Sequence, residues 1–314
     1  MARTHEVAGP TAAPNETRRT WAFTGLTAIA PMAWGTTYVV TTELLPPGIP
    51  LLAGVIRALP AGLLLLLITR TLPRGDWWWR SAVLGTLNIG ALFALLFVAA
   101  YRLPGGVAGT LGAVQPLLVC GIALALLGVR PTRWQLGWGV AGVVGVGLIV
   151  LRGDMAFDAI GVAAGVAAAA SMGTGIVLTK RWGRPPGVGT LAFTGWQLTA
   201  GGLLLVPVAL AVEGLPPTPD ASALAGYAWL TLVGTALAHS LWFQGLGRLP
   251  VTAASFLTLL SPAVAALLGW LVLDESLTPL QGVGFAIALL AIACAQLTPE
   301  AARSLVRAKP AAPR

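Results

Sequence analysis

Long apolar runs separated by short polar segments dominate the pattern of this chain. Ten runs can be marked, and each is close to the roughly 20 residues that cross a bilayer as a helix. They cover about residues 22–44, 50–69, 81–101, 105–127, 135–151, 158–179, 190–212, 223–246, 250–272 and 279–297. None alternates with the period of a membrane β-barrel strand. The pattern predicts an all-α integral membrane protein with ten transmembrane helices.

Two parts of the chain repeat each other. Residues 102–135 align with residues 248–281 without a gap, so that Pro116 falls on Pro262. Looser matches relate Trp34-Gly35-Thr36 to Met172-Gly173-Thr174, Pro46-Pro47-Gly48 to Pro185-Pro186-Gly187, and Ala61-Gly62 to Gly201-Gly202. The copies lie five spans apart, and because five is odd they insert in opposite directions. The sequence predicts two inverted five-helix repeats, residues 21–152 and 153–298, with disordered cytoplasmic tails at 1–20 and 299–314.

The basic residues indicate how the chain is oriented. With the N-terminus in the cytoplasm, only Arg102 and Arg152 of the 19 basic residues fall outside, while Arg57 lies within a span. Cytoplasmic loops carry an excess of Lys and Arg. We therefore expect a multi-pass protein of the cell membrane with both termini in the cytoplasm. The net charge of +8 and the isoelectric point near 10.7 fit this orientation better than nucleic-acid binding.

Pro116 and Pro262 lie near the middle of matching spans. Matched interruptions of this kind are a sequence pointer to the binding site of an inverted-repeat carrier. Proline is also common in membrane helices as a packing kink, so a structural role remains open. Gln115 and Ser261 precede the two prolines, next to the carbonyls of Gly112 and Thr258 that the prolines are expected to free. We expect Gln115 and Ser261 to face the transport path.

Few ionisable side chains lie within the spans, and each is costly there. Arg57 could hold a substrate carboxylate or could join helix ends through backbone carbonyls, and the second role is favoured. His239 could bind a substrate, or could be a neutral histidine bonded to a neighbouring helix. Trp242 lies on the same helix face as His239.

Other polar and aromatic residues complete the candidate site. Asn88 is an amide well inside the third span, and Gln197 aligns with Arg57 in the second repeat. Such groups could bind substrate or could join helices through hydrogen bonds. Trp34 and Tyr38 are four residues apart and are expected to share a helix face as an aromatic wall, although interfacial anchoring is a simpler role for many tryptophans.

Several of these residues resemble a known family. Trp34-Gly35 in the first span, Arg57 in the second, and the segment 277–281 after Asp274-Glu275 are similar to the EamA family of the drug/metabolite transporter superfamily. The resemblance covers about residues 22–298. It implies ten helices, cytoplasmic termini, export of amino acids or other small metabolites, and a central cavity lined mainly by spans 1, 3, 4, 6, 8 and 9. One departure is Gly128-Val129-Arg130, which replaces the acidic loop motif after the fourth span.

These observations predict a secondary transporter, an exporter or facilitator, that moves small metabolites across the cytoplasmic membrane by alternating access. The alternative is a membrane-embedded enzyme acting on a lipid-linked substrate, but His239 has no acidic partner in any span. We expect no enzyme activity, no cofactor and no metal. The chain has no P-loop motif, so we expect that ATP hydrolysis within this chain does not drive transport. The expected partners are a small-molecule substrate and the lipid bilayer, with the chain a monomer or weak dimer.

Overall fold

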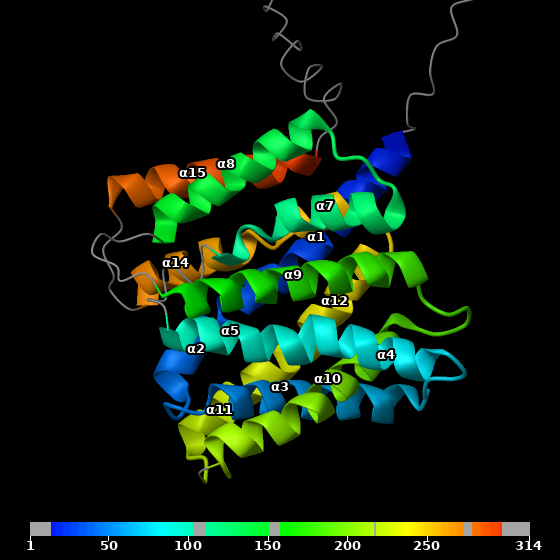
Figure 1. Ribbon diagram of the computed structural model, residues 1–314, viewed down its shortest axis with the longest axis vertical. Helices are drawn as coiled ribbons and strands as arrows, with labels where there is room; N and C mark the ends of the chain where they lie inside the picture. The colour runs from blue at the N-terminus through cyan, green and yellow to red at the C-terminus, as the bar shows by residue number, and fades with distance from the viewer. Residues whose placement is uncertain (1–13, 103–110, 151–157, 217, 273–277, 297–314) are drawn as a thin grey trace, which may run out of the picture.

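The computed structural model describes residues 14–102, 111–150, 158–216, 218–272 and 278–296 as a bundle of helices (Figure 1), with no strand in these ranges. The elements, with π-helical segments written η, are α1 (Pro14–Gly35), α2 (Thr37–Leu44), α3 (Pro50–Thr69), α4 (Trp77–Gly85), η1 (Thr86–Gly90), α5 (Ala91–Arg102), α7 (Gln115–Leu127), α8 (Arg133–Val150), α9 (Ala159–Trp182), α10 (Thr190–Glu213), α11 (Ala221–Thr231), η2 (Leu232–Leu237), α12 (Ala238–Leu246), α13 (Val251–Leu257), α14 (Leu260–Val272) and α15 (Pro279–Gln296).

The helices follow the apolar runs of the sequence closely. Five segments are long and apolar enough to cross a membrane: Pro50–Thr69, Trp77–Leu96, Ala159–Trp182, Thr190–Glu213 and Ala221–Leu246. Many of their large apolar side chains point outward, and Leu67 and Val212 are 69% and 70% exposed. Such exposure is favourable only where lipid replaces water around the bundle. The described chain is therefore an all-helical integral membrane protein.

Four of the predicted spans are interrupted rather than continuous. The third and eighth contain η1 and η2. The offset that places Pro116 on Pro262, extended towards the N-terminus beyond the aligned segments, places the first residue of η1 on the first residue of η2. The ninth is broken by a turn at Thr258–Leu259, and α7 of the fourth is preceded by a turn at Ala113–Val114. Pro116 and Pro262 each follow a break, within the first turn of the next helix, where proline is tolerated.

The first span is also broken. α1 ends at Gly35 and α2 begins at Thr37, so Trp34 and Tyr38 belong to separate helical segments joined by Thr36. The side chain of Tyr38 is not among the described parts of the structure, so the aromatic wall stays a prediction. The break lies where α14 approaches closely, because a Cβ at Gly35 would lie 2.7 Å from the carbonyl oxygen of Ser261. Only glycine leaves room for this contact between α1 and α14.

At the N-terminus α1 extends further than expected. It begins at Pro14, so residues 14–20, which composition assigned to a tail, are helical. Glu and Arg are good helix formers, and no glycine or proline separates this segment from Trp21. Other predictions fall outside the described residues, namely those for 1–13, 299–314, Arg152, Asp274, Glu275 and the segment 103–110 of the first repeat copy.

Polar side chains cap helices at several loops. Asp158 accepts the N–H of Gly161 at the start of α9, and Asp220 accepts the N–H of Ala223 at the start of α11. These backbone hydrogen bonds hold the pKa of each carboxyl below its usual value. Since the folded pKa is lowered, both caps stabilise the fold at neutral pH and are lost as the pH falls through the lowered values.

α8 and α15 begin with the same capping arrangement. Gln135 Oε1 accepts the N–H of Thr132, and Thr132 Oγ1 accepts the N–H of Gln135, at 3.0 and 3.1 Å. Thr278 and Gln281 repeat both bonds, at 2.8 and 3.3 Å. Each residue reciprocally satisfies an N–H group that a helix start would otherwise leave unpaired. The starts of α8 and α15, which align in the two repeat copies, therefore have one local structure.

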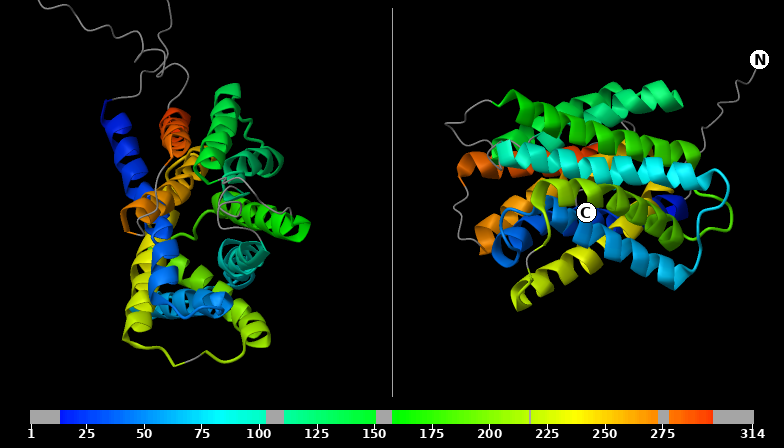
Figure 2. Two further views of the ribbon diagram at one scale, coloured as in Figure 1. Left: turned by 90° about the vertical axis from the view of Figure 1, so that its left-hand side faces the viewer. Right: turned by 60° about the horizontal axis from the view of Figure 1, so that its bottom comes forward.

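α3 and α10 form a close antiparallel pair. Glu213 at the end of α10 accepts the N–H groups of Leu51 and Leu52 at the start of α3, both at 2.7 Å. At the other end, Trp196 Nε1 donates to the carbonyl of Thr71 at 2.7 Å. α8 and α15 are likewise antiparallel, because Trp134 near the start of α8 donates to the carbonyl of Cys294 near the end of α15. The two pairs lie at opposite sides of the bundle (Figures 1 and 2).

The two ends of the bundle differ in charge. At the right-hand end in Figure 1 lie the loops after α3, α7 and α9, which carry Arg70, Arg74, Arg130 and Arg184. At the left-hand end the loops before α9 and α11 carry Asp158 and Asp220. Arg102 also lies at this acidic end, in an ion pair with Asp158 at 3.3 Å.

Candidate functional site

Arg57 connects α3 to the π-helix η2. Its Nε donates to Thr235 Oγ1 at 3.0 Å and its Nη2 to the carbonyl of Gly234 at 3.1 Å, while the guanidinium lies over the ring of Phe93 at 5.1 Å. Only 8% of Arg57 is exposed. A π-helix disturbs the regular pairing of backbone groups, so its carbonyls are available to such a donor. In this structure the guanidinium joins two helices through backbone and hydroxyl groups.

Asn88 lies within the other π-helix, η1. Its Nδ2 donates to Gln197 Oε1 on α10 at 2.9 Å, and both side chains are buried. A Cβ at Gly175 would overlap Asn88 Oδ1, so a larger residue there would displace the Asn88 side chain. Because Gln197 aligns with Arg57, each of the two matched residues bonds to a π-helix in the opposite half of the chain.

Trp34, His239 and Trp242 form an aromatic cluster between α1 and α12. The ring centroids of Trp34 and His239 are 5.1 Å apart, and those of Trp34 and Trp242 are 5.3 Å apart. The ring of Phe243 follows at 6.3 Å from that of His239. The structure therefore brings together three of the residues that the sequence singled out, from the first and the eighth predicted spans.

The cluster contains a donor and an acceptor for a polar ligand. His239 Nδ1 lies 3.1 Å from the carbonyl of Thr235, the residue whose hydroxyl accepts from Arg57. A neutral imidazole that donates from Nδ1 has Nε2 left as an acceptor. Trp34 Nε1 is buried and has no hydrogen-bond partner within the described ranges. Since buried donors are normally paired, this N–H is available to a ligand.

The two proline-associated breaks lie against α1 and α9. The carbonyl of Ser261 packs on Gly35, next to Trp34, while a Cβ at Gly173 would lie 3.3 Å from a methyl group of Val119 on α7. Gly35 and Gly173 belong to the matched motifs of the first and sixth spans. The contact of α1 with α14 thus corresponds to the contact of α9 with α7.

Gln115 and Ser261 differ in their surroundings. Gln115 is 5% exposed, and its Nε2 has no partner in the part of the chain that the structure describes. Ser261 is half-buried. The carbonyl of Thr258, expected to be freed by Pro262, instead accepts the N–H of Ser261 at 3.1 Å because the chain tightens into a turn there. The side chain of Tyr38 lies outside the described structure.

Sequence reasoning missed Glu213 and the role of several basic residues. Glu213 ends an apolar run and has no pattern around it, since its partners at the start of α3 are 162 and 161 residues away in the chain. Lys180, Arg184 and Arg248 were assigned only to the basic side of the membrane, yet the structure gathers them around one cavity. Of these residues, Lys180 could have been singled out from the sequence, because it directly follows an apolar run.

Comparison with known proteins agrees with this architecture. The model of the EamA-like transporter family matches residues 21–151 and 159–296. The chain belongs to the EamA-like transporter family. It is 47% identical to protein PecM of Dickeya dadantii over 255 residues, which are 81% of this chain and 86% of PecM.

More distant similarities extend over comparable lengths. The chain is 30% identical to the uncharacterized transporter sll0355 of Synechocystis over 294 residues, covering 85% of this chain and 88% of that protein. A solved crystal structure has a TM-score of 0.75 at 19% identity, covering 90% of this EamA-like chain and 99% of the other. That similarity shows a shared fold. The chain is therefore an integral membrane protein of a transporter family, as its sequence predicted.

Proposed function

We propose that this EamA-like protein is a secondary transporter, exporting or facilitating the movement of small metabolites across the cytoplasmic membrane. Ten membrane-spanning helices, in two inverted five-helix repeats, change access to a shared central site. The observation that carries this proposal is the matched set of helix interruptions: η1 corresponds to η2, and the break before Pro116 corresponds to the break before Pro262. Interrupted helices at equivalent places are typical of inverted-repeat carriers.

The antiparallel pairs support the inverted relation of the repeats. Two helices related by an axis in the membrane plane run in opposite directions and can pack directly on that axis. α3 and α10 are the second predicted spans of their repeats, and α8 and α15 are the fifth. Both pairs are antiparallel and in contact. The shared capping arrangement before α8 and α15 supports the same relation.

The proposed substrate site contains Trp34, His239 and Trp242, with Ser261 of α14 next to Gly35. Gln115 on α7 and Asn88 in η1 remain proposed members of the site. The aromatic faces would bind an apolar part of the substrate, and the indole N–H and the imidazole Nε2 would bind a polar part. Arg57 acts as a positioning residue that maintains η2 beside this cluster. Tyr38 remains a proposed member of the site.

The charge difference between the ends supports an orientation with the basic end in the cytoplasm, where both termini would also lie.

A thiol introduced at Arg74, at the basic end, is expected to react with an impermeant reagent only after lysis. One introduced at Thr218, at the acidic end, should react in intact cells. Both positions are exposed. The measurement is labelling in a background with Cys120 and Cys294 replaced by alanine, and equal labelling of both positions in intact cells would contradict the orientation.

Water access to Gln115 and Ser261 tests the transport path without requiring a known substrate. In the same background, Gln115→Cys and Ser261→Cys are expected to react with a small hydrophilic thiol reagent in membranes. Gln115 is buried in the state described here, so its reaction requires the opening that alternating access provides. The measurement is the rate of modification by mass spectrometry.

Gly121→Cys is a matched control on the same helix. Nothing lies within 4 Å of a Cβ at Gly121, which is exposed on the outside of the bundle. In the proposed membrane this position faces lipid, where a hydrophilic reagent does not partition and a thiol does not ionise. The proposal fails if Gly121→Cys reacts as fast as the other two, or if neither Gln115→Cys nor Ser261→Cys reacts.

A further inference from the structure

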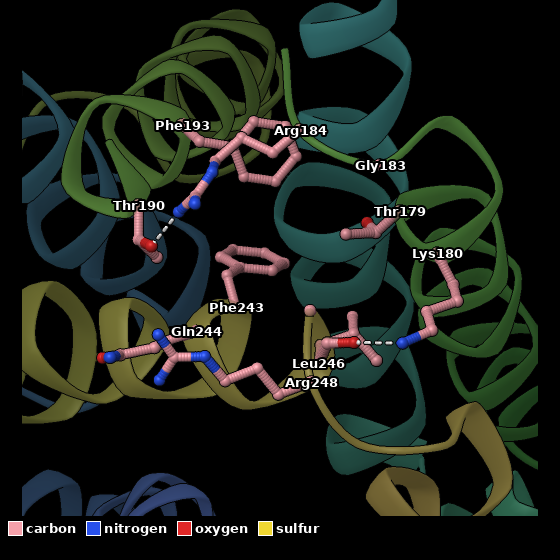
Figure 3. A pocket seen from close by; sticks show the side chains of 11 residues that line it. Thr179, Lys180, Gly183, Arg184, Thr190, Phe193, Phe243, Gln244, Leu246 and Arg248 are labelled. Atoms are coloured by element: carbon pink, nitrogen blue, oxygen red, sulfur yellow. Dashed lines mark hydrogen bonds between the residues drawn. The ribbon is translucent and has the colours of Figure 1, made fainter. Parts of the chain in front are cut away.

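A cavity of about 360 Å³ opens at the basic end of the bundle, beyond the aromatic cluster. The end of α9, the start of α10 and the end of α12 enclose it. It is lined by Thr179, Lys180, Gly183, Arg184, Thr190, Phe193, Phe243, Gln244, Leu246, Gly247 and Arg248 (Figure 3). Its volume lies in the range of small-molecule sites.

The cavity is cationic, and the described residues that line it include no carboxylate. Lys180 Nζ donates to the carbonyls of Leu246 and Leu249, at 3.1 and 2.9 Å, so backbone oxygens rather than an acidic side chain hold the ammonium. The guanidinium of Arg184 donates to Thr190 Oγ1. The ion pairs found among the described residues involve Arg80 and Arg102 and none of the cavity's cations.

A helix start adds to this positive potential. α10 begins at Thr190, and Gly189 at its N-cap provides no side-chain acceptor. The first N–H groups of a helix lack intrahelical partners and attract an anion. α10 is 24 residues long, so its full dipole ends beside Arg184. The charge bias of a membrane protein requires only that basic residues lie in the cytoplasmic loops. It does not require three cations and a helix start to meet at one cavity, as they do in this structure.

Two aromatic rings form an apolar part of the same cavity. Phe193 and Phe243 meet edge to face with centroids 5.9 Å apart, and Figure 3 shows Phe243 between Arg184 and Lys180. Phe243 also contacts His239, which contacts Trp34. Phe243 therefore contacts both the cavity and the aromatic cluster.

We propose that this cavity binds the oxyanion group, a carboxylate or a phosphate, of a small molecule with an aromatic or other apolar body. Arg184, Lys180 and the start of α10 bind the oxyanion, and Arg248 contributes charge at the rim, where its guanidinium stacks on Phe23 at 4.0 Å. The rings of Phe193 and Phe243 contact the apolar body. Binding at this site is independent of transport; only its role as the inner mouth, which selects anionic substrates, rests on the proposed function.

Titration calorimetry tests the site on the full chain in nanodiscs of phosphatidylcholine. The probes are phenyl phosphate, inorganic phosphate and benzyl alcohol. Phenyl phosphate is expected to bind, inorganic phosphate to bind more weakly, and benzyl alcohol not to bind. Arg184→Gln and Arg248→Gln are each expected to weaken phenyl phosphate binding by about tenfold, the effect of one lost charge-assisted interaction. No binding by the folded wild-type protein would overturn the proposal.

Arg181→Gln is the matched control, because Arg181 is exposed at the end of α9, close in sequence to Arg184, and does not line the cavity. Equal weakening by Arg181→Gln would mean a general surface charge effect and would also overturn the proposal. Lys180→Gln is less informative, since Lys180 holds the end of α12. Melting curves of each variant show that the fold is intact.

Discs that also contain phosphatidylglycerol identify the source of the oxyanion. If the anionic lipid competes with phenyl phosphate in the wild type and not in Arg184→Gln, the site stands with a lipid headgroup as its ligand. If phenyl phosphate binds equally well in both kinds of disc, the site stands with a soluble ligand. Binding without uptake of any anionic compound into proteoliposomes would contradict the proposed transport and leave the site in place.

Discussion

Gly201→Ala is expected to lower the melting temperature of the purified protein by several degrees. A Cβ at Gly201 would overlap the carbonyl oxygen of Gly85 and would lie 2.6 Å from Cβ of Ile89, so α10 would have to move away from α4 and η1. Overpacking of this kind costs about 1–3 kcal/mol, and more where backbone rather than a side chain must shift. The measurement is thermal unfolding in detergent.

Gly121→Ala is the same chemical change, but it is not expected to lower the melting temperature. Gly121 lies inside α7, and nothing is within 4 Å of its Cβ position. Alanine is favoured over glycine inside a helix by about 1 kcal/mol, so this variant should be as stable as the wild type or more so. If Gly201→Ala has the same melting temperature as Gly121→Ala, the close contact between α4 and α10 is wrong.

Removing the guanidinium of Arg57 is expected to have the second large effect. Arg57→Met leaves the carbonyl of Gly234 and the hydroxyl of Thr235 without this donor in a buried region. A buried polar group that loses its partner costs about 1–3 kcal/mol. Since η2 also positions His239, the variant should be less stable and should transport poorly. Arg57→Lys retains the charge but has no planar fork to reach both acceptors, and it should restore little.

A double-mutant cycle separates this bond from other effects of Arg57. Arg57→Met, Thr235→Val and the double variant should show a coupling energy of about 1–2 kcal/mol in unfolding measurements. The Asn88–Gln197 pair is the matched comparison, because it joins the equivalent helices through a neutral hydrogen bond. Its coupling should be smaller, since bonds to charged groups are stronger. A coupling near zero for Arg57 and Thr235 would show that Arg57 stabilises the protein through other partners.

The matched positions of these two pairs show how far an internal repeat can guide interpretation. Alignment of the two repeats relates Gln197 to Arg57, and in the folded protein both have the same task of bonding to a π-helix. Alignment could not show that task, because neither π-helix has a sequence signature. η1 and η2 occupy equivalent places in the two repeats, but no aligned position in them has the same residue. We therefore attribute the two interruptions to the packing around them.

The sequence alone determined the helical segments and their approximate ends. The run predicted at 50–69 is the helix Pro50–Thr69, and the run at 279–297 is Pro279–Gln296. The reason is local: in lipid every backbone group must bond within its own segment, so an apolar run of sufficient length specifies a helix by itself. His239 and Trp242 were related correctly for the same reason, as helical spacing places them on one face.

Only the tertiary structure decided the contacts between distant segments. Ser261 approaches Gly35 at the end of α1, Glu213 caps α3 from the end of α10, and Lys180 reaches carbonyls at and just beyond the end of α12. Each depends on which helices become neighbours, and helix association in lipid relies on close packing and a few polar bonds that leave no periodic pattern. The cavity between α9, α10 and α12 has the same origin, since it exists only where three helix ends from separate parts of the chain meet.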